Sequence, residues 1–194
     1  MARGKRAGII AVIGIIVLLI IIYGAWYIGT RNTLVTLEEE IDGAWSEIDN
    51  QLKRRSDLIP NLVSTVRGYA AQEKEVFTNI AEARAKLAGA KTVPETAQGY
   101  NQLETALSRL LVVVERYPEL KSNTNFLRLQ DELAGTENRI AVARKRYNDS
   151  VRIFNTKIRR FPASVVARRM GFERKDYFEI EEEAREVPKV DFES

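Results

Sequence analysis

The sequence predicts an all-α protein in which an N-terminal transmembrane helix precedes an elongated antiparallel bundle of about four long helices. Two observations support this class. A run of 23 uncharged residues lies near the N-terminus, from Ala7 to Gly29. Beyond it, apolar residues recur at spacings of three and four, which places them on one side of a helix. No strand-type alternation of apolar and polar residues competes with this periodicity.

The uncharged run is long enough to cross a bilayer. As a helix it spans roughly 34 Å, against about 30 Å for the hydrocarbon core. Tyr23, Trp26 and Tyr27 gather at its far end, where amphipathic rings favour the headgroup region. The expected anchor residues include Ile9, Ile15, Leu18, Ile22 and Trp26.

A cleaved signal peptide is the alternative interpretation of this run. Its apolar region is usually about 7 to 15 residues long and precedes a small-residue cleavage site. Here the run is longer and ends in bulky aromatic residues, so we predict an uncleaved anchor. Arg3, Lys5 and Arg6 precede it, whereas Arg31 is the single basic residue shortly after it. The positive-inside rule then predicts a cytoplasmic N-terminus and a folded part outside. We expect the anchor to lie in the cell (inner) membrane.

The first two bundle helices are predicted over residues 33–55 and 57–89. Pro60 is expected in the first turn of the second helix, where proline is tolerated, and Gly89 at its end. The stripe of the first helix comprises Leu34, Leu37, Ile41, Trp45, Ile48 and Leu52. That of the second comprises Ile59, Leu62, Val66, Tyr69, Val76, Ile80 and Leu87.

The third and fourth helices have clearer boundaries. Thr92 and Glu95 form a capping-box pattern that begins the third helix, and Pro118 is expected to end it. The fourth is predicted over residues 124–161, because apolar residues fall there at every seventh position. Such a repeat favours a left-handed, coiled-coil-like crossing. Its members are Phe126, Leu133, Ile140, Tyr147, Phe154 and Phe161.

After Pro162 we expect one more short helical turn, ended by Gly171, and then an acidic tail. The predicted organisation is therefore an anchor over residues 1–30, a bundle over 31–171 and a tail over 172–194. We hypothesise that three aromatic residues fasten the tail to the bundle or to a neighbouring subunit. They are Tyr177, Phe178 and Phe192.

Composition excludes several chemistries. The chain has 30 Lys plus Arg, 27 Asp plus Glu, no His and no Cys, so thiol and imidazole catalysis and disulfides are excluded. Residues 31–194 hold 27 basic and 27 acidic side chains, which leaves no net field to attract nucleic acid. No catalytic, cofactor-binding or metal-ligating set is predicted, and no cofactor is implied.

Charged clusters are the remaining candidates for an interaction site. The trio Lys53, Arg54 and Arg55 could bind an acidic partner or lipid headgroups, although ordinary solvation is the simpler interpretation. A second basic trio comprises Arg144, Lys145 and Arg146, and an acidic run comprises Glu38, Glu39 and Glu40. The basic region of the fourth helix continues with Lys157, Arg159 and Arg160, and the acidic run continues with Asp42. We expect this basic region to meet the acidic run or the acidic tail of another subunit.

Two long stretches carry a family resemblance. These are LEEEIDGAWSEIDNQLKRRSDLIPNLVSTVRGYAAQE over residues 37–73 and LSRLLVVVERYPELKSNTNFLRLQDELAGTENRIAVARKRYNDSVRIFNTKIRRFP over residues 107–162. They closely resemble the LemA family of bacterial membrane proteins. The resemblance implies a single-pass membrane protein with an all-helical domain, and it supplies no catalytic residue. Because family members are often encoded near membrane peptidases or small membrane proteins, it also implies a partner in envelope maintenance.

The leading functional hypothesis is a non-enzymatic interaction or scaffold protein, anchored in the lipid bilayer of the bacterial envelope and self-associating. An envelope enzyme is one alternative, but no GxSxG, P-loop, kinase or zincin pattern is present. A protein that remodels membranes through amphipathic surfaces is another, and vesicle tubulation would distinguish it from a scaffold.

Overall fold

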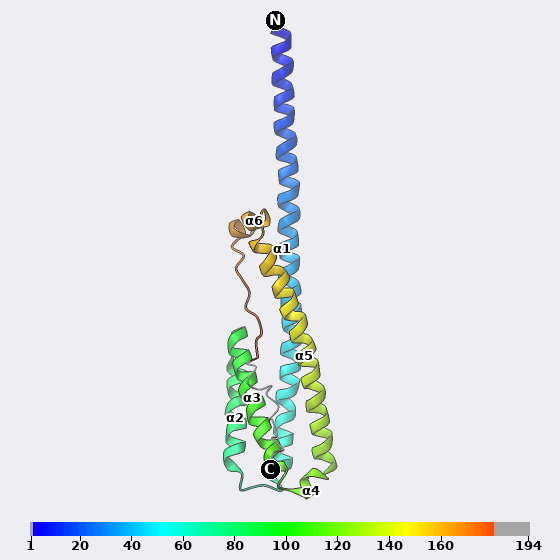
Figure 1. Cartoon of the computed structure of the whole chain (residues 1–194), viewed down its shortest axis with the longest axis vertical. Helices are drawn as coiled ribbons and strands as arrows, with labels where there is room; N and C mark the ends of the chain where they lie inside the picture. The colour runs from blue at the N-terminus through cyan, green and yellow to red at the C-terminus, as the bar shows by residue number, and fades with distance from the viewer. Residues whose placement is uncertain (1, 181–194) are drawn as a thin grey trace, which may run out of the picture. The chain divides into compact units, whose positions relative to one another are not determined.

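A computed structural model describes residues 2–180, which form six α-helices and no strand (Figure 1). The predicted all-α class, with an apolar N-terminal helix ahead of a bundle, is confirmed. Two compact units share the helices, a first unit of Met1–Asp42 with Ser150–Lys175 and a second of Gly43–Asp149 with Asp176–Ser194. The helices are α1 (Ala2–Arg67), α2 (Lys74–Gly89), α3 (Val93–Val114), α4 (Pro118–Lys121), α5 (Thr124–Arg159) and α6 (Ala163–Met170).

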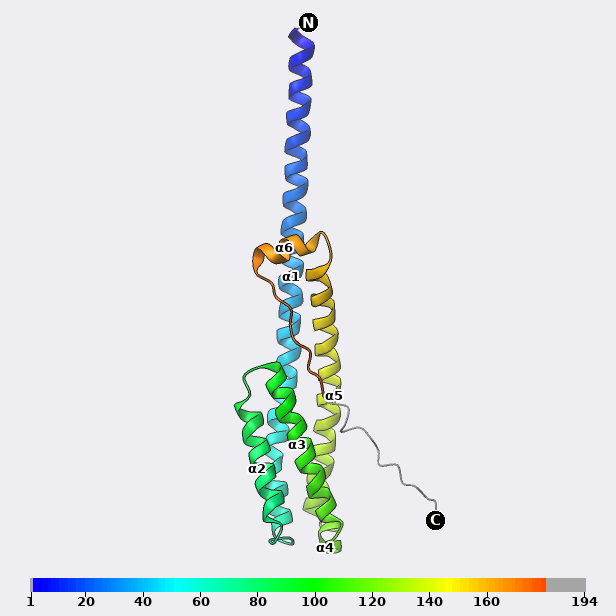
Figure 2. The same cartoon turned by 60° about the vertical axis from the view of Figure 1, so that its left-hand side comes forward.

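The first unit packs the end of α5 and the short helix α6 against α1. Figures 1 and 2 both show α6 beside α1 in this unit. Apolar side chains from all three helices are buried, and Phe154 meets Phe172 edge to face at 5.9 Å. They include Leu34, Ile41, Val151, Ile158, Val166 and Ala167.

A short turn and a glycine define α6. The Phe161–Pro162 peptide bond is cis, and α6 begins at Ala163. Gly171 ends the helix with a left-handed φ of 72°, a conformation that glycine adopts without steric cost. The predicted short helix and its glycine stop are therefore confirmed. The prediction that Phe161 joins the buried stripe is wrong: α5 ends two residues earlier, at Arg159, and Phe161 is 84% exposed.

The second unit brings α2, α3, α4 and the larger part of α5 together with α1 (Figure 2). The seven-residue repeat of α5 is buried here as predicted, at Phe126, Leu133, Ile140 and Tyr147. Helices α2 and α3 pack closely, because a Cβ atom on Gly99 would lie 2.8 Å from the Cα of Leu87. The predicted capping box of Thr92 and Glu95 begins α3.

The boundary predicted between residues 55 and 57 is wrong. Helix α1 continues to Arg67, and Pro60 lies inside it instead of in a first turn. Proline has no N–H to donate to the carbonyl four residues earlier, which here belongs to Ser56. Arg84 of α2 supplies a replacement, donating from Nε to the Ser56 carbonyl at 3.1 Å and to its hydroxyl at 3.0 Å. The helix therefore passes Pro60, and the chain turns between Gly68 and Glu73 instead.

Smaller differences follow from these boundaries. Tyr69, expected on a helical stripe, follows α1 and is 39% exposed, and Phe77 is buried where Val76 was expected. Helix α3 ends at Val114, before Pro118, and Pro118 begins α4. Proline is suited to a first helical position because its missing N–H would have no partner there.

Candidate functional site

The apolar part of α1 is the first candidate site. Among the described residues, α1 is the one helix long and apolar enough to cross a membrane. The predicted anchor side chains Ile15, Leu18 and Ile22 are each more than half exposed. Trp26 lies half-buried with its ring 5.8 Å from that of Tyr23, and the Ile9 side chain lies outside the described ones. Large apolar side chains therefore face outward along several turns without protein to cover them.

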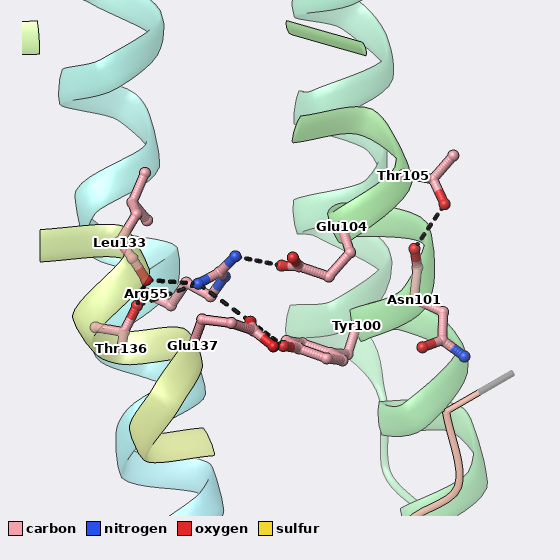
Figure 3. Close-up of polar contacts among 8 residues, drawn as sticks. All are labelled: Arg55, Tyr100, Asn101, Glu104, Thr105, Leu133, Thr136 and Glu137. Atoms are coloured by element: carbon pink, nitrogen blue, oxygen red, sulfur yellow. Dashed lines mark hydrogen bonds and ion pairs between the residues drawn. The ribbon is translucent and has the colours of Figure 1, made fainter. Parts of the chain in front are cut away.

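The second candidate is a charged cluster around a buried arginine in the second unit, drawn in Figure 3, with two partly exposed carboxylates beside it. Arg55 of α1 is only 5% exposed. Its Nη2 atom lies 2.5 Å from Oε1 of Glu104 on α3, and its Nη1 atom lies 3.4 Å from Oε2 of Glu137 on α5. Arg55 therefore joins three helices through two ion pairs.

Neutral groups complete this Arg55 cluster. Nη1 of Arg55 also donates to the Leu133 carbonyl at 2.8 Å and to Oγ1 of Thr136 at 3.3 Å. The Tyr100 hydroxyl donates a hydrogen bond to Glu137. Buried charges are tolerated when they are paired and hydrogen-bonded. These contacts satisfy both terminal nitrogens of Arg55, whereas its Nε atom has no hydrogen-bond partner among the described residues.

The cluster carries two carboxylates for one guanidinium. Burial raises the pKa of Glu104, the Arg55 charge opposes that shift, and the Glu137 charge adds to it. Burial also raises the pKa of Tyr100, and the nearby Glu104 charge raises it further, so its hydroxyl keeps the proton that it donates to Glu137. Arg55 keeps its proton, because arginine is not deprotonated in proteins, and the raised pKa of Glu104 makes this carboxylate easier to protonate than an ordinary glutamate.

A cavity of about 210 Å³ adjoins the cluster. Leu62, Leu107, Leu111 and Leu133 form its apolar wall beside Arg55, Glu104 and Glu137. Ser108 lines it too and is exposed.

The predicted basic candidates have different environments. Lys53 and Arg54 are exposed, as ordinary solvation predicts. Solvation is the wrong interpretation for Arg55. Its side chain is buried and points toward α3 and α5, where it forms ion pairs with Glu104 and Glu137. In the other trio, Arg144 is half-buried and Lys145 is exposed. Arg146 lies 3.3 Å from Glu47 on α1 within the same unit.

The acidic candidates lie in the first unit. Glu38 pairs with Lys175 at 2.6 Å, so one carboxylate of the run has a partner in its own chain. Glu39 and Glu40 are exposed. No group of three or more acidic side chains that could hold a metal ion occurs among the described residues.

The tail is fastened through its backbone as well as through aromatic rings. In the second unit, Asn148 donates to the Phe178 carbonyl at 3.1 Å and accepts from the Phe178 N–H at 2.9 Å. The Phe178 ring is buried against Trp45 and Tyr100. The tail hypothesis is confirmed for Phe178; Tyr177 is half-exposed, and Phe192 lies outside the described residues.

Sequence reasoning missed Glu104, Glu137 and the tail-binding role of Asn148. The signal for the two glutamates is positional, because each stands beside the apolar stripe of its helix, between Leu103 and Leu107 or between Leu133 and Ile140. A carboxylate at the edge of a core stripe can reach a cation on a facing helix. No comparable local pattern distinguishes Asn148.

Comparison with known proteins identifies the family of this helical chain. The LemA family model matches residues 44–192. Magnetosome protein MamQ 2 of Paramagnetospirillum magneticum is 26% identical over 215 residues, covering 96% of this chain and 78% of the relative. Protein LemA of Metamycoplasma hominis is 29% identical over 168 residues, covering 85% of this chain and 74% of the relative. Magnetosome protein MamQ of Magnetospirillum gryphiswaldense is 26% identical over 173 residues, covering 76% and 64%. The chain, all-helical and with one helix able to span a membrane, belongs to the LemA family.

Proposed function

We propose that the chain is a single-pass, membrane-anchored interaction protein of the bacterial envelope that self-associates and works without catalysis. The observation that carries the anchoring is the exposure of Ile15, Leu18 and Ile22 on α1. In water this apolar surface would be costly, whereas in a bilayer it faces hydrocarbon. The N-terminus lies in the cytoplasm and the folded part outside, as the basic residues before the anchor favour.

Surface charge supports the self-association. Lys53, Arg54 and Lys145 are exposed basic residues of the second unit, and Glu39 and Glu40 are exposed acidic residues of the first. Opposite charges on two copies of one chain attract each other and set the register of an assembly. The Arg55 cluster does not take part, because its charges are paired inside the second unit. It stabilises the bundle that presents the surface.

Anchoring and orientation are tested by single-cysteine labelling, since the chain has no cysteine of its own. Ala2→Cys and Thr105→Cys are treated with a membrane-impermeant maleimide in intact spheroplasts and after lysis. We expect Thr105→Cys to react in intact spheroplasts and Ala2→Cys only after lysis. Extraction of both variants by alkaline carbonate would refute the anchor, and the reverse labelling pattern would refute the orientation.

Self-association is tested by a charge-reversal cycle on the full-length protein in mild detergent. Arg54→Glu with Lys145→Glu, or Glu39→Lys with Glu40→Lys, should lower the measured mass. Combining both reversals should restore it, because the attraction returns with its signs exchanged. The matched control is Asp131→Lys, an exposed reversal on α5 outside both clusters. A wild-type mass of one chain at every concentration would refute self-association.

A further inference from the structure

We propose that the corner between α5 and α6, residues 157–169, docks on the headgroup layer of the membrane that α1 crosses and binds acidic phospholipids. The corner would insert Phe161 among the headgroups, with arginines around it. This inference rests on the membrane anchoring proposed above. It assigns a lipid-binding surface to the folded part of the chain.

The apolar element of the corner is Phe161. At 84% it is the most exposed large hydrophobic side chain among the described residues. Val165, one turn into α6, is also 46% exposed, while Ala163, Val166 and Ala167 hold the other side of α6 in the core. The corner therefore presents an apolar tip that the protein itself leaves uncovered. Aromatic rings of this kind concentrate at membrane interfaces.

Exposed basic side chains precede and follow this tip along the chain. Residues 157–169 contain five basic side chains and no acidic one. Arg159, Arg160, Arg168 and Arg169 are exposed, and no carboxylate of the described residues forms an ion pair with them. Lys175 of the same unit, by contrast, pairs with Glu38. Basic side chains near a membrane surface attract anionic lipids. Acidic phospholipids therefore match the charge of these four arginines.

The level of the corner along α1 follows from two contacts in the first unit. Lys175 pairs with Glu38 of α1 and exchanges two backbone hydrogen bonds with the Asn155 side chain of α5. Asn155 and Glu38 therefore lie at about the same level. Helix α5 runs antiparallel to α1 there, so each further residue of α5 approaches the apolar run by about 1.5 Å (Figures 1 and 2).

Counting from this level places the corner at the bilayer surface. Gly29, the end of the uncharged run, is nine residues before Glu38, and Arg159, where α5 ends, is four residues after Asn155. The difference corresponds to about 8 Å along the helix axis, and Phe161 follows two residues beyond that end. A headgroup layer is roughly 5–8 Å thick on each side of the hydrocarbon core. Phe161 and the adjacent arginines thus reach the depth at which phosphate groups and glycerol backbones lie.

The test measures the depth of spin labels on the full-length chain in vesicles of phosphatidylcholine, with and without phosphatidylglycerol. One label is placed at Val165→Cys, which leaves Phe161 intact, and a control label at Val112→Cys, which is 70% exposed on α3. A third, at Leu18→Cys, reports the anchor. Collisions with a water-soluble nickel complex and with oxygen give the depth of each label.

We expect the label at 165 to lose most of its collisions with the nickel complex relative to the label at 112, and to lose more with phosphatidylglycerol. Phe161→Ser should reverse the loss. Exchanging Arg159, Arg160, Arg168 and Arg169 for Gln should abolish the dependence on phosphatidylglycerol. If the label at 18 lies in hydrocarbon while that at 165 remains as accessible as that at 112, the docking surface is refuted and the anchor stands. If the label at 18 is itself in water, the proposed anchoring fails, and the docking surface with it.

Discussion

Arg84 of α2 donates a hydrogen bond from Nε to the Ser56 carbonyl of α1 at 3.1 Å, the carbonyl that Pro60 leaves without a helical partner. A side chain from a second helix thereby replaces a main-chain donor of the first. This contact explains how α1 continues past a residue that normally ends a helix. It also couples the stability of α1 to the packing of α2.

The coupling predicts a non-additive pair of substitutions. Arg84→Met should lower the free energy of unfolding by about 1–2 kcal/mol, because it leaves the Ser56 carbonyl unpaired. In the Pro60→Ala background the same change should cost less, since alanine at 60 supplies its own N–H. Urea titration followed by circular dichroism measures both, with the exposed Lys86→Met on α2 as the control. Equal costs in the two backgrounds would contradict this explanation.

The Arg55 cluster predicts that a second replacement compensates for the loss of stability caused by the first. Arg55→Met should destabilise the protein by up to about 3–5 kcal/mol, because it leaves the partly buried carboxylate of Glu104 without its cation. Arg55→Met with Glu104→Leu should recover most of that loss. Arg54→Met, at an exposed neighbouring position, should change stability by about 0.5 kcal/mol or less. The pairing would be disproved by a double variant as unstable as the single one.

The raised pKa of Glu104 predicts a distinct pH dependence. Since its folded pKa lies above the ordinary value of 4.5, the folded state binds more protons than the unfolded state between these two values. The contribution of this group to stability is therefore complete below 4.5 and is lost as pH rises through the folded pKa. Unfolding free energies of wild type and Glu104→Gln, measured across this range, isolate the effect. A wild-type stability that rises with pH relative to the variant would contradict the sign.

The packing of Phe178 predicts that its replacement destabilises the protein and loosens the tail. Phe178→Ala should cost about 3–5 kcal/mol, because it removes a buried ring from contact with Trp45 and Tyr100. It should also speed tryptic cleavage after Lys175. The half-exposed neighbour gives the control, Tyr177→Ala, for which we expect a smaller effect on both measurements. Identical behaviour of the two variants would show that Phe178 does not fasten the tail.

Local signals in the sequence predict the parts of the fold that depend on neighbouring residues. The capping box at Thr92 and Glu95 and the glycine stop at Gly171 are of this kind, because each acts within a few residues. The seven-residue repeat also predicts the buried residues correctly along the length of α5. It fails at Phe161, which continues the pattern in sequence but follows the last helical turn.

Features that depend on distant partners are not predictable in this way. Nothing near Pro60 indicates that Arg84 accommodates it, and nothing near Arg55 indicates that Glu104 and Glu137 face it across the bundle. The basic surface at the α5–α6 corner is likewise not predictable from neighbouring residues, because its position along α1 depends on how α5 packs on α1. The composition of the apolar segment of α1, by contrast, is fully local and is recognisable from the sequence.

Native mass spectrometry of vesicles made directly from membranes of expressing cells tests the central claim most directly. A self-associating, uncleaved membrane protein should leave these vesicles as assemblies whose masses are multiples of 22.1 kDa, with α1 intact in every chain. Detection of single chains alone, or of a shorter polypeptide without the apolar helix, would contradict it.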